Sequence, residues 1–301
     1  MKIYSNYNRI PNGNASEILT PGCLVLEGGA FRAVYGEGVV DALMMADINF
    51  ESTIGISAGA LNGISYVSGQ IGRSARINLK YRHDPRYVGP KAWIRNQSTI
   101  GFDYLFGKLN ERDPLNVSRF FCTNRRFFVG AANCRTANLD IFEKNSAKDI
   151  FEVIKASCAI PFVSKIVHIN GEPYLDGGIH TKVPYQWAID QGYEKIVVVR
   201  TRPSDYRKPT SFVEPRIAKL WYHKYPKLIE MLTYVNDIYN RQCEEMIRLH
   251  NAGRIFVIGP SEPVTASRLE PDMEKLGNLY NLGIQDTQNC ILQLKAYLNR
   301  G

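Results

Sequence analysis

Short apolar runs alternate with segments of helical periodicity between residues 23 and 200. Runs of this length, rich in β-branched and aromatic residues, are typical of buried strands, and we predict strands at 23–29, 51–56, 127–132, 138–142, 162–169 and 195–200. Helices are predicted between them at 34–44, 58–69, 147–157 and 184–191. Strands that alternate with helices form a mostly parallel sheet with helices on both faces. The sequence therefore predicts an α/β protein with three α/β/α layers.

Helical patterns dominate after residue 203. Apolar residues recur every three or four positions from Leu228 to Leu249, which predicts a long amphipathic helix. A short strand at 254–258 and a final helix at about 271–299 are predicted to follow. We expect the chain to consist of an N-terminal leader segment over 1–20, an α/β core over 21–203, and a mainly helical C-terminal region over 204–301 packed on that core.

The composition is that of an ordinary globular protein, with 45% hydrophobic and 22% charged residues. No apolar run approaches the ~20 residues that cross a bilayer, and the polar N-terminus lacks the apolar stretch of a signal peptide. We therefore expect a cytoplasmic protein. The six cysteines are scattered, with no CxxC pair and no histidine at metal-binding spacing, which predicts reduced thiols and no metal site.

The chain is basic, with a formal net charge of +8. Its lysines and arginines cluster only mildly, as in 80–82, 125–126 and 216–227, and none of these clusters forms a nucleic-acid-binding motif. A solvated basic surface is the simplest interpretation, and peripheral contact with an anionic membrane is the alternative. Nucleic acid is not an expected partner.

Residues 55–59 read Gly-Ile-Ser-Ala-Gly and fit the pattern G-x-S-x-G. This pattern carries functional meaning only between a strand and a helix, and both are predicted here. A serine on such a sharp turn needs very small neighbours, because larger side chains would clash with the flanking elements. The turn would expose the Ser57 hydroxyl and direct the Ala58 N–H toward a developing oxyanion. A plain glycine-rich turn with a surface serine is the alternative.

A second glycine-rich loop, from Glu27 to Ala33, follows the first predicted strand. Its adjacent Gly28 and Gly29 let consecutive amides point into a cavity, as the oxyanion of acyl transfer requires. A phosphate-binding loop is the competing interpretation, but neither G-x-G-x-x-G nor a Walker lysine is present. Arg32 would hold the loop electrostatically or bind an acidic head group.

A histidine or a carboxylate could act as the base that activates Ser57. His83 and His250 have the sequence context of surface residues. Asp176 lies on a tight glycine turn directly after a short strand, and a desolvated carboxylate about 2.6–3.2 Å from a hydroxyl can deprotonate it. An ordinary turn aspartate is one alternative. A Ser-His-Asp arrangement with His168 or His180 is another.

Three motifs thus occur in order: GG-x-x-R at 28–32, G-x-S-x-G at 55–59 and D-G-G at 176–178. Together they resemble the patatin-like phospholipase family, and in particular its bacterial members. The segments Ala156–Pro161, Gly171–Gly178 and Val183–Pro184 are similar to the family's A-S-x-A-x-P, G-x-x-Y-x-D-G-G and V-P segments. The similarity extends through most of the C-terminal helices.

This resemblance implies a patatin-like fold whose catalytic core is 21–203, and a serine acyl hydrolase that forms an acyl-enzyme intermediate on lipid or other carboxylic esters. Carried over by position, Ser57 is the nucleophile and Asp176 the base of a catalytic dyad. Gly28, Gly29 and Ala30 line the oxyanion hole with Ala58, Arg32 is the supporting basic residue, and no cofactor or metal is used. The alternative is a catalytically weak lipid-binding or regulatory module of the same fold.

Two departures from the family pattern affect loops around the site. Ala30 and Ala33 stand where many members have glycine, which bears on the fit of the oxyanion hole. The segment Cys134–Ala137 replaces a Thr-Gly turn. Residues 86–127, rich in aromatic and basic side chains, are interpreted either as an acyl-binding wall or lid or as a core-packing insertion. Phospholipid, lysophospholipid, neutral glyceride and small esters are all compatible substrates.

Overall fold

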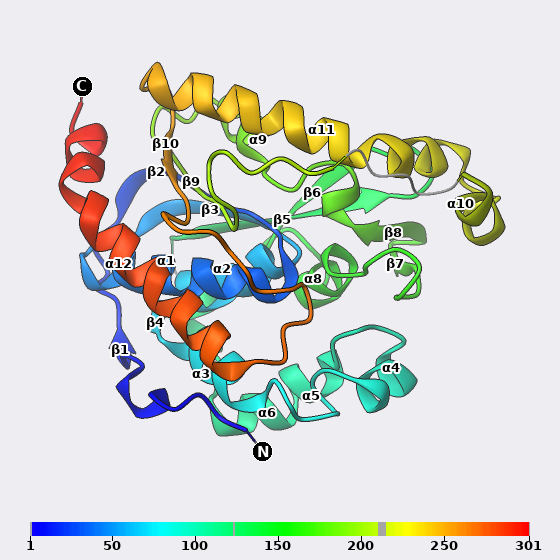
Figure 1. Ribbon diagram of the computed structural model, residues 1–301, viewed down its shortest axis with the longest axis horizontal. Coiled ribbons are helices and arrows are strands. Elements are labelled where there is room, and N and C mark those ends of the chain that lie inside the picture. Colours follow the sequence, from blue (N-terminus) through cyan, green and yellow to red (C-terminus); the bar gives the residue numbers. More distant parts are fainter. Residues whose placement is uncertain (1, 123, 210–214, 301) are drawn as a thin grey trace.

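The computed structural model describes residues 2–122, 124–209 and 215–300 (Figure 1). An eight-stranded sheet forms its centre, in the order β10-β9-β2-β3-β5-β8-β7 with β6 beside β5. Its strands are β2 (Thr20–Leu26), β3 (Phe50–Ile56), β5 (Arg126–Asn133), β6 (Leu139–Glu143), β7 (Val167–Ile169), β8 (Glu172–Asp176), β9 (Ile196–Val199) and β10 (Phe256–Ile258). A separate short pair joins β1 (Gly13–Asn14) to β4 (Gln70–Ile71).

Helices cover both faces of this sheet, which confirms the predicted three-layer α/β/α fold. One layer contains α1 (Val34–Met45), α2 (Ala58–Val67), α3 (Arg73–Tyr81), α8 (Ile150–Ser157) and α12 (Met273–Leu298). The other contains α9 (Tyr185–Asp190) and α11 (Pro226–Asn251). Successive side chains of a strand point to opposite faces of the sheet, and in β2 both faces are apolar. Leu24 and Leu26 pack in the core on one face, whereas Cys23 and Val25 pack in the core on the other. In Figure 1, α11 and α12 lie on opposite sides of the sheet.

The sheet is parallel from β10 to β5 and antiparallel beyond it. β6 and β8 both run antiparallel to β5, and β7 pairs antiparallel with β8. The prediction of a strand over 162–169 is wrong for its first half. Turns and irregular backbone occupy 162–166, and only Val167–Ile169 form a strand. This antiparallel end brings two strand ends together. Ile56 pairs with Gly130 and Asp176 pairs with the adjacent Ala131 on the same edge of β5, since β6 pairs with both of these β5 residues on the other edge.

Small residues allow the C-terminal helix α12 to pack closely on α1. A side chain at Gly38 of α1 would overlap the backbone of Tyr280, and one at Gly283 of α12 would overlap the backbone of Tyr35. The buried Tyr4 of the N-terminal segment packs against α12 in the same way, at Gly277. The part boundaries near 20 and 203 stay predictions.

The segment 86–127 folds into four short helices: α4 (Pro90–Asn96), α5 (Phe102–Phe106), α6 (Lys108–Arg112) and α7 (Val117–Cys122). Most of its aromatic residues pack inward, and Phe102, Tyr104 and Phe120 are buried in the first core. Trp93 on α4 is instead 52% exposed. Much of the segment is therefore core packing, and only part of it is available to line a binding surface. None of the helices that the structure describes combines the length and apolar content of a membrane-spanning segment.

Candidate active site

Ser57 lies at the turn from β3 into α2, in a backbone conformation that a serine rarely adopts. Its φ is 54° and its ψ is −125°. Such conformations cost on the order of 1–3 kcal/mol and persist only where the surrounding structure enforces them. The Ser57 N–H donates to the Ser157 hydroxyl at 2.8 Å, and that hydroxyl donates to the Gly130 carbonyl at 2.7 Å. The strained turn is thus tied to α8 and to β5.

The two glycines of the motif are required by packing. A Cβ at Gly55 would lie 2.6 Å from the Ala60 nitrogen, and a Cβ at Gly59 would overlap the carbonyl of Leu26 on the neighbouring strand. Backbone atoms cannot move aside as a flexible side chain can. The strand-turn-helix context that the sequence predicts for Ser57 is therefore present, and its small neighbours have the predicted physical cause.

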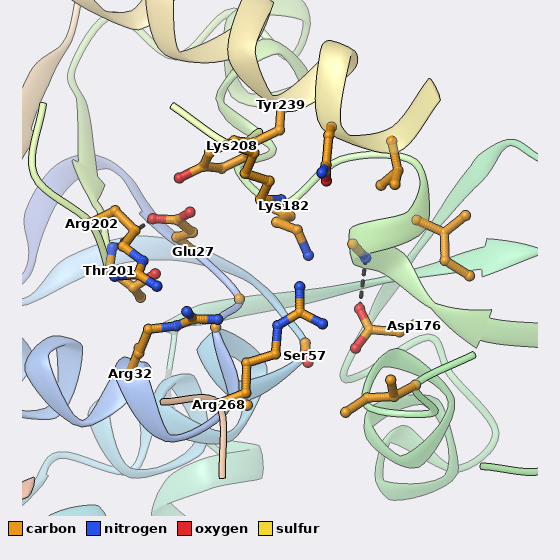
Figure 2. A pocket seen from close by; sticks show the side chains of 18 of the residues that line it. Glu27, Arg32, Ser57, Asp176, Lys182, Thr201, Arg202, Lys208, Tyr239 and Arg268 are labelled. Carbon is orange, nitrogen blue, oxygen red and sulfur yellow. Dashed lines mark hydrogen bonds between the residues drawn. The ribbon is translucent and has the colours of Figure 1, made fainter. Parts of the chain in front are cut away.

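Asp176 reaches Ser57 through the antiparallel end of the sheet. Ile56 and Asp176 pair with adjacent residues on the same edge of β5, and β3 and β8 run toward each other along it, so the residue that follows Ile56 lies next to the end of β8. The Gly178 N–H donates to Asp176 Oδ1 at 2.7 Å (Figure 2). Burial raises the pKa of Asp176 above its ordinary value, while the charge of Lys182 and a hydrogen bond with the Ser57 side chain act in the opposite direction.

The glycine loop after β2 lies beside these two residues and begins a short 3-10 helix, Ala30–Ala33. The Gly28 N–H donates to the Lys182 carbonyl at 3.2 Å, so this amide is not free for an oxyanion. A Cβ on Gly28 would lie 2.8 Å from the Ile56 carbonyl oxygen, which explains the glycine by packing. The amides of Gly29 and Ala30 have no hydrogen-bond partner in the described parts of the chain.

Two further details of this loop concern the predicted oxyanion donors. Ala30 has a φ of 51°, in the left-handed region that favours glycine, so its backbone is strained at the position where many family members have glycine. Ala58 is the first residue of α2, where a helix leaves its N–H groups without an intrahelical partner. Of the predicted oxyanion donors, Gly29, Ala30 and Ala58 thus have amides without a hydrogen-bond partner in the described parts of the chain, whereas the Gly28 amide is occupied.

Ser57 lies where two cavities meet. The larger has a volume of about 440 Å³ and also contains Asp176, the loop 27–30, part of α11 and Arg268. The smaller has a volume of about 50 Å³ and is lined mainly by apolar groups, among them Val34, Leu61 and Ile100. Ala30 and Ile160 line both cavities. An ester whose carbonyl sits at Ser57 would thus have a polar space on one side and an apolar one on the other.

The larger cavity is strongly basic. It is lined by five basic side chains, Arg32, Lys182, Arg202, Lys208 and Arg268, and by two acidic ones, Glu27 and Asp176 (Figure 2). Burial and the nearby charges of Arg202 and Arg268 lower the pKa of Arg32 to about 10. Arg32, predicted as the supporting basic residue, is therefore one member of a larger cationic group that comes from several loops.

Sequence reasoning missed most of this group. Lys182 directly precedes the V-P pair, and Ser157 lies within the A-S-x-A-x-P segment, so the positions of these motifs were the only signal for either residue. Arg202, Lys208 and Arg268 lie in connections with no recognisable pattern. Their convergence depends on which loops meet at the carboxyl edge of the parallel strands.

The alternatives based on histidine or metal ions find no such convergence. Neither His168 nor His180 lines the two cavities at Ser57. Burial lowers the pKa of His180, whose buried Nδ1 has no hydrogen-bond partner among the residues described. In the same parts of the chain, no group of three histidine, cysteine or acidic side chains is placed to hold a metal ion. The side chain of Cys122, one of the six predicted thiols, lies outside the described residues.

Comparison with known proteins defines the class of this fold and site. A family model described as patatin-like phospholipase matches residues 24–189, more than half of the chain. The chain belongs to the patatin-like phospholipase family. A second model, described as a domain of unknown function (DUF6363), matches residues 225–299.

The chain is also similar to individual known proteins. The chain is 29% identical over 269 residues to the uncharacterized protein YjjU of Escherichia coli (strain K12), covering 86% of this chain and 74% of that protein. It is 29% identical over 213 residues to the probable lipid hydrolase 463L of Invertebrate iridescent virus 6, covering 62% and 71%. Among solved structures, VipD from Legionella pneumophila matches with a TM-score of 0.48 and 12% identity, covering 94% of this chain and 68% of VipD.

Proposed function

We propose that this protein is a serine acyl hydrolase of lipid esters, with Ser57 as nucleophile and Asp176 as general base. The observation that carries the proposal is the strained Ser57 turn beside the buried Asp176 carboxylate, at the floor of a cavity. Family membership supports it, as does a relative named as a probable lipid hydrolase. A carboxylate with a raised pKa is a stronger base than an exposed one, as direct activation of a serine requires.

The proposed reaction has two steps. In the first, Asp176 accepts the hydroxyl proton of Ser57 while Oγ bonds to the ester carbonyl carbon. The tetrahedral intermediate then breaks its bond to the alcohol oxygen, which takes the proton from Asp176 and leaves. In the second step water gives a proton to Asp176 and its oxygen bonds to the acyl carbon. Oγ is expelled and regains its proton, so that the net reaction is ester plus water to acid plus alcohol.

The oxyanion of both intermediates would be bound by the amides of Gly29, Ala30 and Ala58. Such donors are effective because they are held in place before the reaction begins, and each typically contributes on the order of 3 kcal/mol to the transition state. The Gly28–Lys182 backbone bond would hold the loop in this orientation. The apolar pocket beside Ser57 would accept the start of the acyl chain. Ile100 and Val88 of the 86–127 segment form part of its wall.

The rival function is a lipid-binding or regulatory module without turnover, and a fluorophosphonate probe separates the two. We expect the wild-type protein to be labelled stoichiometrically at Ser57, because only an activated serine attacks the phosphorus centre. Intact-mass analysis and peptide mapping would locate the adduct. The Ser57→Ala variant is the control and should remain unlabelled. A folded wild-type protein that resists labelling would favour the binding module.

We also propose that the protein works at the surface of an anionic membrane, in keeping with a cytoplasmic location. Exposed apolar side chains on and near two helices form what we call the apolar rim, which consists of Trp93, Ile94, Val163, Ile217, Leu220 and Trp221. It joins α4 to α10 (Pro215–Tyr222), which lie at the same end of the fold in Figure 1. Lys91 and Arg95 on α4 and Arg216 and Lys219 on α10 accompany the apolar residues.

The rim is continuous with the mouth of the large cavity. Trp93 Nε1 donates to the Val163 carbonyl at 2.9 Å, and the adjacent Phe162 has its ring 6.2 Å from that of Trp221. Phe162 itself lines the cavity. Exposed tryptophan and leucine beside lysine and arginine are typical of helices that lie in the head-group region of anionic bilayers.

Replacing both Leu220 and Trp221 by serine tests this surface. We expect at least a 10-fold weaker partition into vesicles containing phosphatidylglycerol, because two apolar side chains no longer enter the bilayer. Vesicle co-sedimentation measures the partition, with pure phosphatidylcholine vesicles showing the contribution of charge. Leu292→Ser on α12 is the matched control, since Leu292 is 77% exposed but lies outside the rim. Equal loss in both variants would contradict the assignment.

A further inference from the structure

The basic side chains of the large cavity outnumber its acidic ones and are not neutralised within the protein. None of the five forms an ion pair with any residue in the described parts of the chain. Of the two carboxylates, Glu27 accepts the Thr201 N–H and Asp176 accepts the Gly178 N–H. A cluster of like charges with so little compensation is costly in a partly buried site unless an anion enters it.

Lys208 carries a buried ammonium group that no hydrogen bond compensates among the described residues. Its nitrogen lies 3.9 Å from the centre of the Tyr239 ring. Burial, together with the positive charges of Lys182 and Arg268, lowers the pKa of Lys208 to about 6. An anion bound beside it would favour the charged form.

The backbone of Lys208 is held firmly in this position. Its N–H donates to Asn240 Oδ1 at 2.8 Å, and Asn240 Nδ2 donates to its carbonyl at 2.9 Å. Asn236 on the same helix donates to the Pro209 carbonyl at 2.9 Å. Helix α11 therefore fixes the connection that places the lysine over the cavity.

Lys182 and Arg268 face the same space from other loops. In Figure 2 the ends of both side chains turn toward one another between Ser57, Asp176 and Lys208. The electrostatic effects agree with this placement, since Arg268 lowers the pKa of both Lys182 and Lys208. Arg202, whose guanidinium also donates to the Val264 carbonyl at 2.8 Å, completes the basic wall.

From this arrangement we infer that the large cavity contains a subsite for a phosphate-class anion, bound by Lys182, Lys208, Arg202 and Arg268 and separate from the reacting ester group. Lysine and arginine are the side chains that bind phosphate groups through charge-assisted hydrogen bonds. The subsite lies across Ser57 from the apolar pocket. A substrate that places its acyl chain in that pocket would thus carry its phosphate on the alcohol side of the scissile bond.

This substrate assignment rests on the proposed hydrolase function, whereas anion binding does not. The ligand is either a phosphate ester of a lipid or a soluble phosphate that occupies the cavity as a regulator. Both sources share the same chemistry at the lysines and arginines, and two experimental arms distinguish them.

The first arm measures binding of inorganic phosphate by calorimetry at constant ionic strength. We expect saturable binding to the wild-type protein and at least about 10-fold weaker binding to Lys208→Met, as for the loss of one hydrogen bond to a charged group. Lys208→Gln provides a second variant should the first misfold. Lys148→Met is the control, because it removes an exposed lysine outside the cavity.

The second arm compares kcat/KM for two soluble short-chain substrates that differ only in phosphate, a monoacylglycerol and the corresponding monoacylglycerol phosphate. We expect the wild-type enzyme to prefer the phosphorylated ester by about 10-fold or more, and Lys208→Met to lose most of that preference. Phosphate binding together with this preference identifies a lipid phosphate as the ligand. Phosphate binding without the preference identifies a soluble anion.

If the wild-type protein neither binds phosphate nor prefers the phosphorylated ester, the subsite does not exist. Absence of hydrolysis of either ester, with phosphate binding intact, would instead contradict the proposed hydrolase function and leave the anion subsite standing. Equal effects of Lys208→Met and Lys148→Met in the binding arm would also overturn the inference.

Discussion

Ser57→Ala is expected to lower kcat/KM for a soluble p-nitrophenyl ester by at least ~10⁴-fold, because no acyl-enzyme can form without the Oγ nucleophile. The substitution removes one oxygen and keeps the Cβ. The backbone strain at φ 54° is enforced by Gly55, Gly59 and the Ser157 hydrogen bond, so the variant should fold normally. Initial rates with both proteins, together with matched circular dichroism spectra, give the measurement.

Ser118→Ala is a suitable control for the Ser57 experiment, since Ser118 is an exposed serine on α7, away from both cavities. It should retain wild-type activity. Undiminished hydrolysis by a folded Ser57→Ala protein would remove Ser57 from the mechanism. The family assignment would stand in that case, because it rests on the match over residues 24–189.

Asp176→Asn is expected to lower kcat/KM by ~10³-fold, within the range typical of a lost general base. Asparagine keeps the shape of the side chain, and its amide oxygen can still accept the Gly178 N–H. The comparison therefore isolates the loss of basicity. Asp140→Asn is the matched control, because Asp140 is another hydrogen-bonded carboxylate, accepting from the Tyr174 hydroxyl at 2.8 Å, but lies outside the cavity.

The pH profile of the wild-type enzyme should identify the same base. Asp176 must be ionised to accept the serine proton, so kcat/KM is expected to fall as pH decreases through the pKa of this carboxyl group. Since burial raises that pKa, the fall should begin above the pH at which an exposed aspartate titrates, about 4. An acid limb at or below that value, or similar activity losses in Asp176→Asn and Asp140→Asn, would contradict the assignment.

The proposed carboxylate base needs no histidine beside Ser57, and none of the described residues that line the two cavities is a histidine. A histidine in a Ser-His-Asp triad needs a carboxylate to orient it, whereas Asp176 is oriented by the turn that contains it, through the Gly178 amide. The surrounding lysines and arginines have a second consequence. Their positive charge favours the oxyanion and ionised Asp176, and so partly offsets the burial that raises its pKa.

Local features of the chain were predictable from residues alone. The turn at Ser57 needs only glycines at 55 and 59 and the flanking apolar runs, because its constraints arise between near neighbours. The two long C-terminal helices were predictable for a similar reason, since a stripe of apolar residues over seven turns has one plausible structure. The end of the sheet was harder: the apolar run at 162–169 resembles a strand, but turns take its first half and only Val167–Ile169 pair.

The sequence by itself determined the order of the elements, the family motifs and the identity of the two proposed dyad residues. Only the tertiary structure decided that β8 runs antiparallel to β5 and so brings Asp176 to Ser57, that the Gly28 amide is occupied, and that Lys182, Lys208 and Arg268 share one cavity. The physical reason is the distance along the chain over which each signal acts. Periodicity and turn chemistry record which face of an element is buried, but which distant loops meet depends on strand pairing, which no single segment encodes.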